Sequence, residues 1–117
     1  MKYGFIGAGN MGGAILRGAL AGGALTASET AVFGVRKEKL ANTASELGIA
    51  PYTDVKEIVR DCKILIFGFK PQMFDEVVPE IAEAYTADKV VVSMAAGISM
   101  AYIEKYLGKS AKVVRIM

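Results

Sequence analysis

The residues with the clearest chemical purpose form the segment Gly7-Ala8-Gly9-Asn10-Met11-Gly12. Its glycines have the GxGxxG spacing of dinucleotide-binding loops, in which they permit a sharp turn, close approach of the backbone to a pyrophosphate, and tight helix packing. A strand-like run precedes it at Tyr3 to Ile6, and a helix-like run follows at Met11 to Ala21. Free N–H groups at a helix start attract a diphosphate. The segment predicts a dinucleotide site; the alternative is a turn that only packs.

The choice of cofactor depends on the end of the second strand-like run, Ala31 to Val35. An NAD site usually has an acidic residue about 20 residues beyond the glycines, bonded to the ribose 2′-hydroxyl. Here the stretch Phe33 to Lys37 contains no carboxylate, the next one being Glu38, and Arg36 stands where a guanidinium could bind a 2′-phosphate. We therefore expect NADP, with NAD as the alternative, and assign Val35 and Arg36 to the site. Otherwise Arg36 and Lys37 are ordinary surface charges.

Two later loops carry the remaining candidates. Lys70-Pro71-Gln72 follows a buried apolar run, Ile64 to Phe69, so its cation is expected to face the pyrophosphate and the nicotinamide ribose. Ser93 to Gly97 contains small residues, which suits a loop that lies flat against a nicotinamide ring and hydrogen-bonds through its main chain. The alternatives are a solvated lysine that ends the strand and a plain turn.

The scaffold that would hold these loops is indicated by strand-like and helix-like runs, which alternate along the chain. Strands are expected at Lys2–Ile6, Ala31–Val35, Ile49–Tyr52, Ile64–Phe69, Val90–Met94 and Lys112–Ile116. Helices are expected at Met11–Ala21, Glu38–Leu47, Val55–Arg60, Phe74–Tyr85 and Ala101–Leu107. The alternation predicts an α/β fold, a doubly wound and mostly parallel Rossmann sheet of order 3-2-1-4-5-6. Its ligands should bind at the carboxyl ends of the strands, where the order reverses.

Local signals support the expected helix boundaries. Gly22-Gly23 and Gly48 are expected to end the first two helices, and Asp54 and Ser99 to cap the third and fifth. Pro79 is expected either to kink the fourth helix or to mark a restart.

Composition limits the class of protein. The 117 residues suit one domain over residues 1–117, and no apolar run is long enough for a membrane span. The basic residues are scattered and the net charge is +2, so no nucleic-acid partner is expected. Glycines and Asn10 interrupt the N-terminal apolar tract, which argues against export, and we expect a cytoplasmic protein.

The chain also has few residues for metal or nucleophilic chemistry. It contains one cysteine and no histidine, which excludes an internal disulfide, a Cys/His metal cluster and a histidine-based catalytic pair within this chain. We expect Cys62 to pack as a small apolar residue.

With these motifs in hand, the chain resembles the N-terminal domain of pyrroline-5-carboxylate reductases, the last enzymes of proline biosynthesis. The resemblance covers the whole chain and rests on four segments: Gly4 to Gly12, Lys70 to Gln72, Ser93 to Ile98, and Arg115 to Met117. In that family the second and third segments line the nicotinamide side of the cofactor, which implies this role for Phe69, Lys70, Pro71, Ala95 and Ala96. A position near Asp54 often carries asparagine and contacts the adenine ribose, so the aspartate departs from the family pattern.

The resemblance implies hydride transfer from NAD(P)H to the C=N carbon of a small-molecule substrate, 1-pyrroline-5-carboxylate, giving L-proline. The family's substrate pocket and proton donor lie in a C-terminal helical domain that also builds the dimer. Because this chain stops at Met117, we expect a fragment of a homo-oligomer that binds cofactor, is inactive alone and has no assignable catalytic residue.

Two alternatives remain open. One is another NADP-dependent reductase of similar architecture, such as a hydroxyacid dehydrogenase or a deazaflavin-dependent NADP reductase. The other is a non-catalytic nucleotide-binding module, such as the reductase-like protein associated with bacterial competence.

Overall fold

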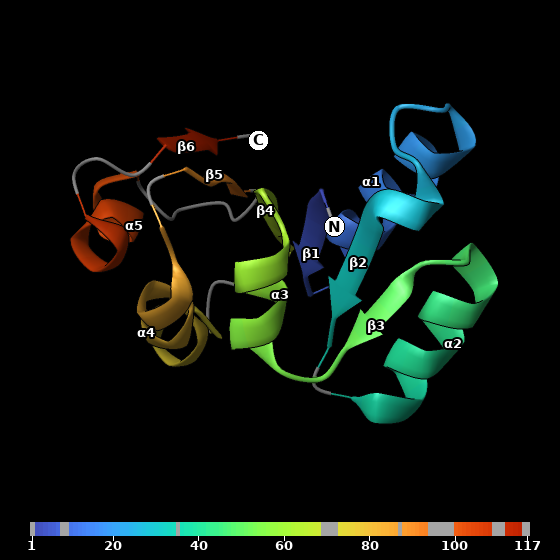
Figure 1. Cartoon of the computed structure of the whole chain (residues 1–117), viewed down its shortest axis with the longest axis horizontal. Coiled ribbons are helices and arrows are strands. Elements are labelled where there is room, and N and C mark those ends of the chain that lie inside the picture. The colour runs from blue at the N-terminus through green and yellow to red at the C-terminus, as the bar shows by residue number, and fades with distance from the viewer. Residues whose placement is uncertain are drawn as a thin grey trace.

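The computed structural model describes residues 2–7, 10–34, 36–68, 73–86, 88–93, 100–108 and 112–115. Six strands pair in parallel in the order β3-β2-β1-β4-β5-β6 (Figure 1). They are β1 (Tyr3–Ile6), β2 (Thr30–Phe33), β3 (Ala50–Tyr52), β4 (Ile64–Phe67), β5 (Val90–Ser93) and β6 (Lys112–Arg115). The α/β class and the strand order expected from the sequence are both confirmed.

The helices alternate with these strands as expected. They are α1 (Asn10–Ala21), α2 (Lys37–Leu47), α3 (Val55–Asp61), α4 (Phe74–Ala84) and α5 (Met100–Leu107), each within one residue of its expected bounds. A short 3₁₀ helix, η1 (Ala27–Glu29), was not expected. Pro79 lies inside α4, which runs without a restart.

Each strand is shorter than its expected range, and two of them end well before the expected residue. β2 and β4 end at Phe33 and Phe67, two residues before their expected ends. Both flank β1, whose next residue, Gly7, has a positive φ of 85° and takes the chain out of the sheet. Without a partner strand at that level, the apolar run cannot extend the ladder. The length of each strand is therefore fixed by its neighbour as well as by its own residues.

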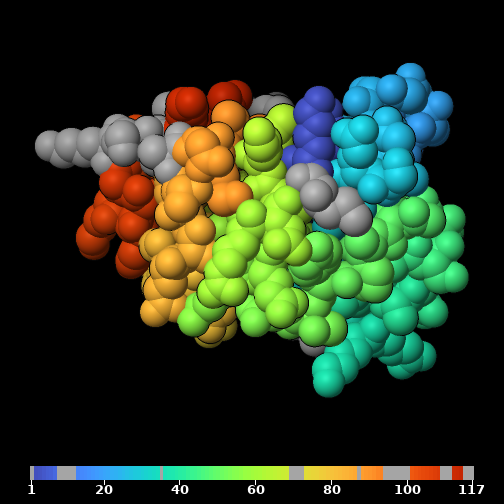
Figure 2. All heavy atoms as spheres, viewed as in Figure 1, coloured from blue at the N-terminus to red at the C-terminus, as the bar shows by residue number. Residues whose placement is uncertain are grey.

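The sheet is covered on both faces, and each face has its own apolar core. Phe5, Val32 and Ile66 pack with Leu16 of α1 and Leu40 of α2 on one face. The next residues along the same strands point the other way, as the two-residue period of a strand requires. They form the second core with α3, α4 and α5, and its buried members are Ile6, Ala31, Val55, Ile58, Val59, Cys62, Leu65, Phe67, Phe74, Val78, Ile81, Val91, Ile103 and Val113. Figure 2 shows α3 and α4 covering the sheet from that side.

The helix ends follow local chemistry. Gly23 has φ 80°, the N–H of Ala24 donates to Ala19 O at 2.9 Å, and the N–H of Gly23 donates to Leu20 O at 3.3 Å, so α1 ends in a Schellman motif. Gly48 ends α2 with φ 70°. These two expectations are confirmed, whereas the expected cap at Ser99 lies outside the described residues.

A polar clamp holds the amino edge of the sheet. Lys89 is buried, and its Nζ donates to Arg60 O at 3.0 Å and Cys62 O at 2.8 Å, the carbonyls at the end of α3. The Tyr85 hydroxyl donates to Lys89 O at 2.9 Å and accepts from Lys112 N at 3.3 Å. A cation at a helix C-terminus is favourable, so these contacts fasten α3 to the starts of β5 and β6. The carboxyl edge remains for ligands.

Candidate functional site

The strands all end in one row, which defines the carboxyl edge of the sheet. Residues at this level are in mutual register, and they are Tyr52, Phe33, Ile6, Phe67, Ser93 and Arg115. The three loops expected to bind the cofactor each begin directly after this row, behind β1, β4 and β5. The order of strands reverses between β1 and β4, where open α/β sheets bind their ligands. The fold therefore brings the three loop starts together.

The glycine loop leaves β1 through a turn that requires glycine. Gly7 has φ 85°, a conformation that side chains disfavour, and its N–H donates to Phe33 O at 2.9 Å. Helix α1 begins at Asn10, and Met11 and Gly12 follow in its first turn, which has no acidic residue. Ala8 and Gly9 lie outside the described residues. A helix thus starts three residues after Gly7 with its N–H groups available to an anion.

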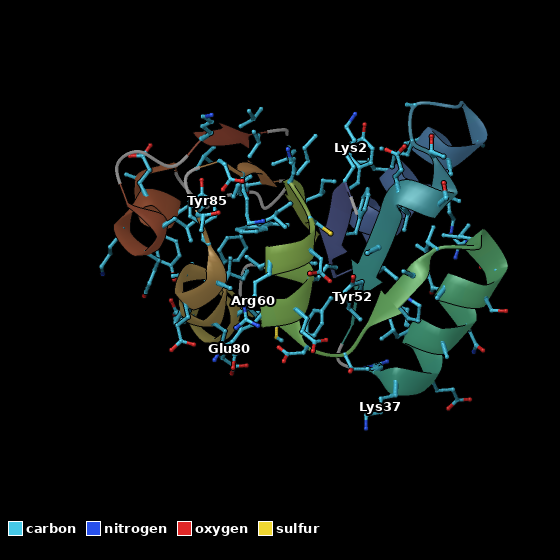
Figure 3. The ribbon with its side chains drawn as sticks, in the orientation of Figure 1. Lys2, Lys37, Tyr52, Arg60, Glu80 and Tyr85 are labelled. Atoms are coloured by element: carbon cyan, nitrogen blue, oxygen red, sulfur yellow. The ribbon has the colours of Figure 1, made fainter. Side chains whose placement is uncertain are left out.

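The start of α2 is the second place suited to an anion. Arg36 precedes the helix without making a side-chain cap, and Lys37 and Lys39 follow in the first turn; all three are exposed. Figure 3 shows Lys37 extending away from the body of the protein. Cations at a helix N-terminus oppose the positive end of its dipole, and Glu38 is the only acid in that turn. This unfavourable clustering suits a bound phosphate. Val35 lies outside the described residues.

Asp54 has a structural task at the neighbouring edge of the sheet. Its carboxylate accepts a hydrogen bond from Lys56 N at 2.9 Å and caps α3, as the sequence predicted. The side chain is exposed and follows β3 at its carboxyl end. Capping uses one carboxylate oxygen, so the second oxygen remains free to accept a hydrogen bond from a ligand.

The residues expected to contact the nicotinamide follow β4 and β5 in the sequence. Phe69, Lys70, Pro71, Ala95 and Ala96 lie outside the described residues. The strands that precede them, β4 and β5, are adjacent and end side by side at Phe67 and Ser93.

Comparisons with known proteins agree with this geometry. A model of the family described as coenzyme F420-dependent NADP oxidoreductases matches residues 2–97. The chain belongs to this family. It is also 37% identical to a pyrroline-5-carboxylate reductase of Methanosarcina acetivorans, over 99% of this chain and 43% of the relative. The chain therefore spans about two fifths of the length of the curated relatives it matches.

Solved structures lead to the same group. A pyrroline-5-carboxylate reductase from Coxiella burnetii superposes with a TM-score of 0.89 at 28% identity, over 99% of this chain and 43% of that one. A pyrroline carboxylate reductase of Plasmodium falciparum, solved with NADP bound, superposes with a TM-score of 0.85 at 25% identity, over 100% and 42%.

Other polar groups near the carboxyl edge of this NADP oxidoreductase domain were not expected as a cluster. The Tyr102 hydroxyl of α5 donates to the Asp75 carboxylate of α4, which raises the pKa of Tyr102 above its ordinary value. The Tyr102 ring also lies edge-on to Phe74, with ring centres 6.1 Å apart. The sequence gives no signal for this pairing because it depends on α4 and α5 lying side by side. Among the described residues, no group of three acidic, Cys or His side chains could hold a metal.

Proposed function

We propose that residues 1–117 form the dinucleotide-binding domain of a pyrroline-5-carboxylate reductase, which transfers hydride from NADPH to 1-pyrroline-5-carboxylate and yields L-proline. One observation carries the proposal. The glycine turn at Gly7 and the basic start of α2 lie on the same carboxyl edge, in a chain similar throughout to enzymes of that name. This arrangement suits one ligand with two phosphate-bearing parts.

Each part of the edge would have its own task. The N-terminus of α1 would hold the pyrophosphate, and Arg36 with Lys37 would bind the 2′-phosphate. The loops after β4 and β5, with Phe69, Lys70, Pro71, Ala95 and Ala96, would orient the nicotinamide. The cofactor supplies the hydride when bound. The protein contributes position, because hydride transfer requires the two carbons to meet in a defined geometry.

The preference for NADP rests on the absence of an acidic residue between the end of β2 and the start of α2. Arg36 is exposed and makes no cap, so its guanidinium is available to a 2′-phosphate. The Plasmodium falciparum relative was solved with NADP. NAD remains the lesser cofactor in this proposal because it lacks the group that Arg36 would bind.

Calorimetric titration of the chain with NADPH and with NADH tests cofactor binding. We expect saturable binding of both, tighter for NADPH. Turnover of 1-pyrroline-5-carboxylate by the complete protein then tests the reaction. If the chain binds neither cofactor, the domain assignment fails; if the complete protein binds NADPH but leaves this substrate unchanged, only the reaction is wrong.

The family description favours a second candidate, hydride exchange between NADP and coenzyme F420. The two reactions share the dinucleotide site and differ in the partner. Incubating the complete protein with NADPH and oxidised F420 separates them, since reduction of F420 would replace the first proposal. We rank the reaction with F420 second because of the sequence identity to pyrroline-5-carboxylate reductases.

We also propose that the complete protein is a cytoplasmic homo-oligomer, as the resemblance to this group of reductases implies. No described helix is both long and apolar enough to pass through a membrane. Light scattering coupled to gel filtration of the complete protein measures the oligomeric state.

A further inference from the structure

Ser93, the last residue of β5, is an exception to the polar pairing of the interior. Three polar or charged side chains are buried in the described part of the chain: Thr30, Lys89 and Ser93. The Thr30 hydroxyl donates to Thr26 O at 2.8 Å, and Lys89 Nζ is held by two carbonyls. The Ser93 Oγ is fully buried and, among the described residues, is the buried side-chain oxygen left without a hydrogen-bond partner.

The position of Ser93 in the sheet offers a reason for its missing hydrogen-bond partner. Thr30 lies at the amino end of its strand and Lys89 at the amino edge of the sheet, whereas Ser93 lies in the last row at the carboxyl edge. Its register neighbour Phe67 ends β4, and the row continues to Ile6, next to the glycine turn. A hydroxyl buried without a partner destabilises the fold and is rare in native proteins. Such a group is explained most simply by a partner that arrives later.

We propose that Ser93 is a positioning residue of the cofactor site, whose hydroxyl gains its hydrogen bond when the nicotinamide end of the dinucleotide is bound. This inference rests on the proposed function, because it needs a dinucleotide at this edge. The partner is the amide group of the nicotinamide. The bond therefore depends on the nicotinamide end and not on the adenosine end, which belongs to the β2 side of the sheet.

The test compares Ser93→Ala with a matched control, Thr30→Val. Both remove one fully buried hydroxyl, but the hydroxyl of Thr30 is already paired in the free chain. Each variant is melted without ligand and titrated with NADPH and with 2′-phospho-ADP-ribose, which lacks the nicotinamide. Ser93→Ala should keep or raise the melting temperature of the free chain, because it removes an unpaired polar group. Thr30→Val should lower it.

The binding results decide between a ligand-dependent and a merely structural role. Loss of one neutral hydrogen bond should weaken NADPH binding by Ser93→Ala about 2- to 10-fold, with 2′-phospho-ADP-ribose unchanged. Thr30→Val should leave both affinities unchanged. Equal effects of Ser93→Ala on the two ligands, no effect on either, or a melting temperature lowered as in Thr30→Val would overturn the inference. If the unaltered chain binds no NADPH, the proposed function fails and this inference with it.

Discussion

At the scale of the residue, Arg36 is the side chain that we propose determines the choice of cofactor. Arg36→Ala should weaken NADPH far more than NADH, because only NADPH carries a 2′-phosphate. A charge-assisted contact is worth roughly 1.5–3 kcal/mol, or about one to two decades in affinity. Isothermal titration with both cofactors measures the difference. Arg60→Ala is the matched control, since Arg60 is an exposed arginine at the far end of α3. Equal losses for both cofactors would show that Arg36 contacts a part they share.

Asp54 caps α3, and one pair of substitutions can test whether it also contacts the ribose. Asp54→Ala should destabilise the fold by about 1 kcal/mol through loss of the cap on α3, whereas Asp54→Asn should not, because asparagine caps as well as aspartate. Chemical denaturation measures both. If the side chain also contacts the ribose, Asp54→Ala should weaken NADPH and NADH alike, and Asp54→Asn should preserve both affinities. Unchanged affinity in both variants would limit Asp54 to capping.

Some of these residues could be recognised from the sequence and others could not. Gly7 and Asp54 act through local backbone geometry, so a short stretch of sequence was enough to predict the turn and the cap. In the sequence, Lys89 resembles an ordinary exposed charge before a strand. It is buried because its Nζ is hydrogen-bonded to the carbonyls of Arg60 and Cys62, which lie 29 and 27 residues earlier in the chain, at the end of α3. The sequence also gives no sign that the Ser93 hydroxyl lacks a hydrogen-bond partner, because this depends on which groups pack around it in the folded chain.

At the scale of the element, β1 packs closely against α3 because Gly4 has no side chain. A Cβ placed on Gly4 would lie 2.9 Å from Cys62 Sγ and 3.1 Å from Ile58 Cγ1. Gly4→Ala should therefore destabilise the fold by about 1–3 kcal/mol. Combining it with Cys62→Ala should recover part of that loss, because the nearest atom is removed. Urea denaturation of the four members of this cycle measures the coupling, and strict additivity would contradict the contact.

The elements also show where sequence patterns stop being sufficient. Alternation of strands and helices predicted the order of the sheet because right-handed crossovers leave few topologies. It did not predict the ends of β2 and β4, which depend on the turn of β1 at Gly7, nor the unbroken course of α4 through Pro79. The apolar runs after Phe33 and Phe67 looked strand-like, but pairing needs a neighbour at the same level.

At the scale of the whole molecule, ionisation of the Cys62 thiol and the Tyr52 hydroxyl should lower the free energy of unfolding at alkaline pH. Burial raises the pKa of Cys62 from 9.0 to about 11, and the hydrogen bond to Asp61 raises that of Tyr52 from 10.0 to about 12. Both folded-state pKa values exceed the unfolded ones, so their stabilisation is complete below pH 9 and is lost as the pH rises to 12. The thiol alone should cost roughly 2 kcal/mol by pH 11. Cys62→Ala should flatten the decline in unfolding free energy between pH 9 and 11, and an unaltered slope would contradict this assignment.

The last prediction concerns what residues 1–117 can do without the rest of a complete reductase. The sheet, both cores and the glycine turn are present, so this chain should fold and bind NADPH. It should not reduce 1-pyrroline-5-carboxylate, because the relatives it matches are more than twice as long and the imine needs groups on both faces of the nicotinamide. Misplacement of the reacting atoms by about 1 Å can cost roughly a hundredfold in rate.

NADPH oxidation by purified residues 1–117, measured beside the complete protein at equal cofactor saturation, checks this expectation. The absorbance of NADPH should stay constant for the chain and fall for the complete protein. Proline formation by the chain alone, freed from host enzyme, would contradict the prediction. In that case Lys70, Ser93 and Tyr102 would become the residues to replace first.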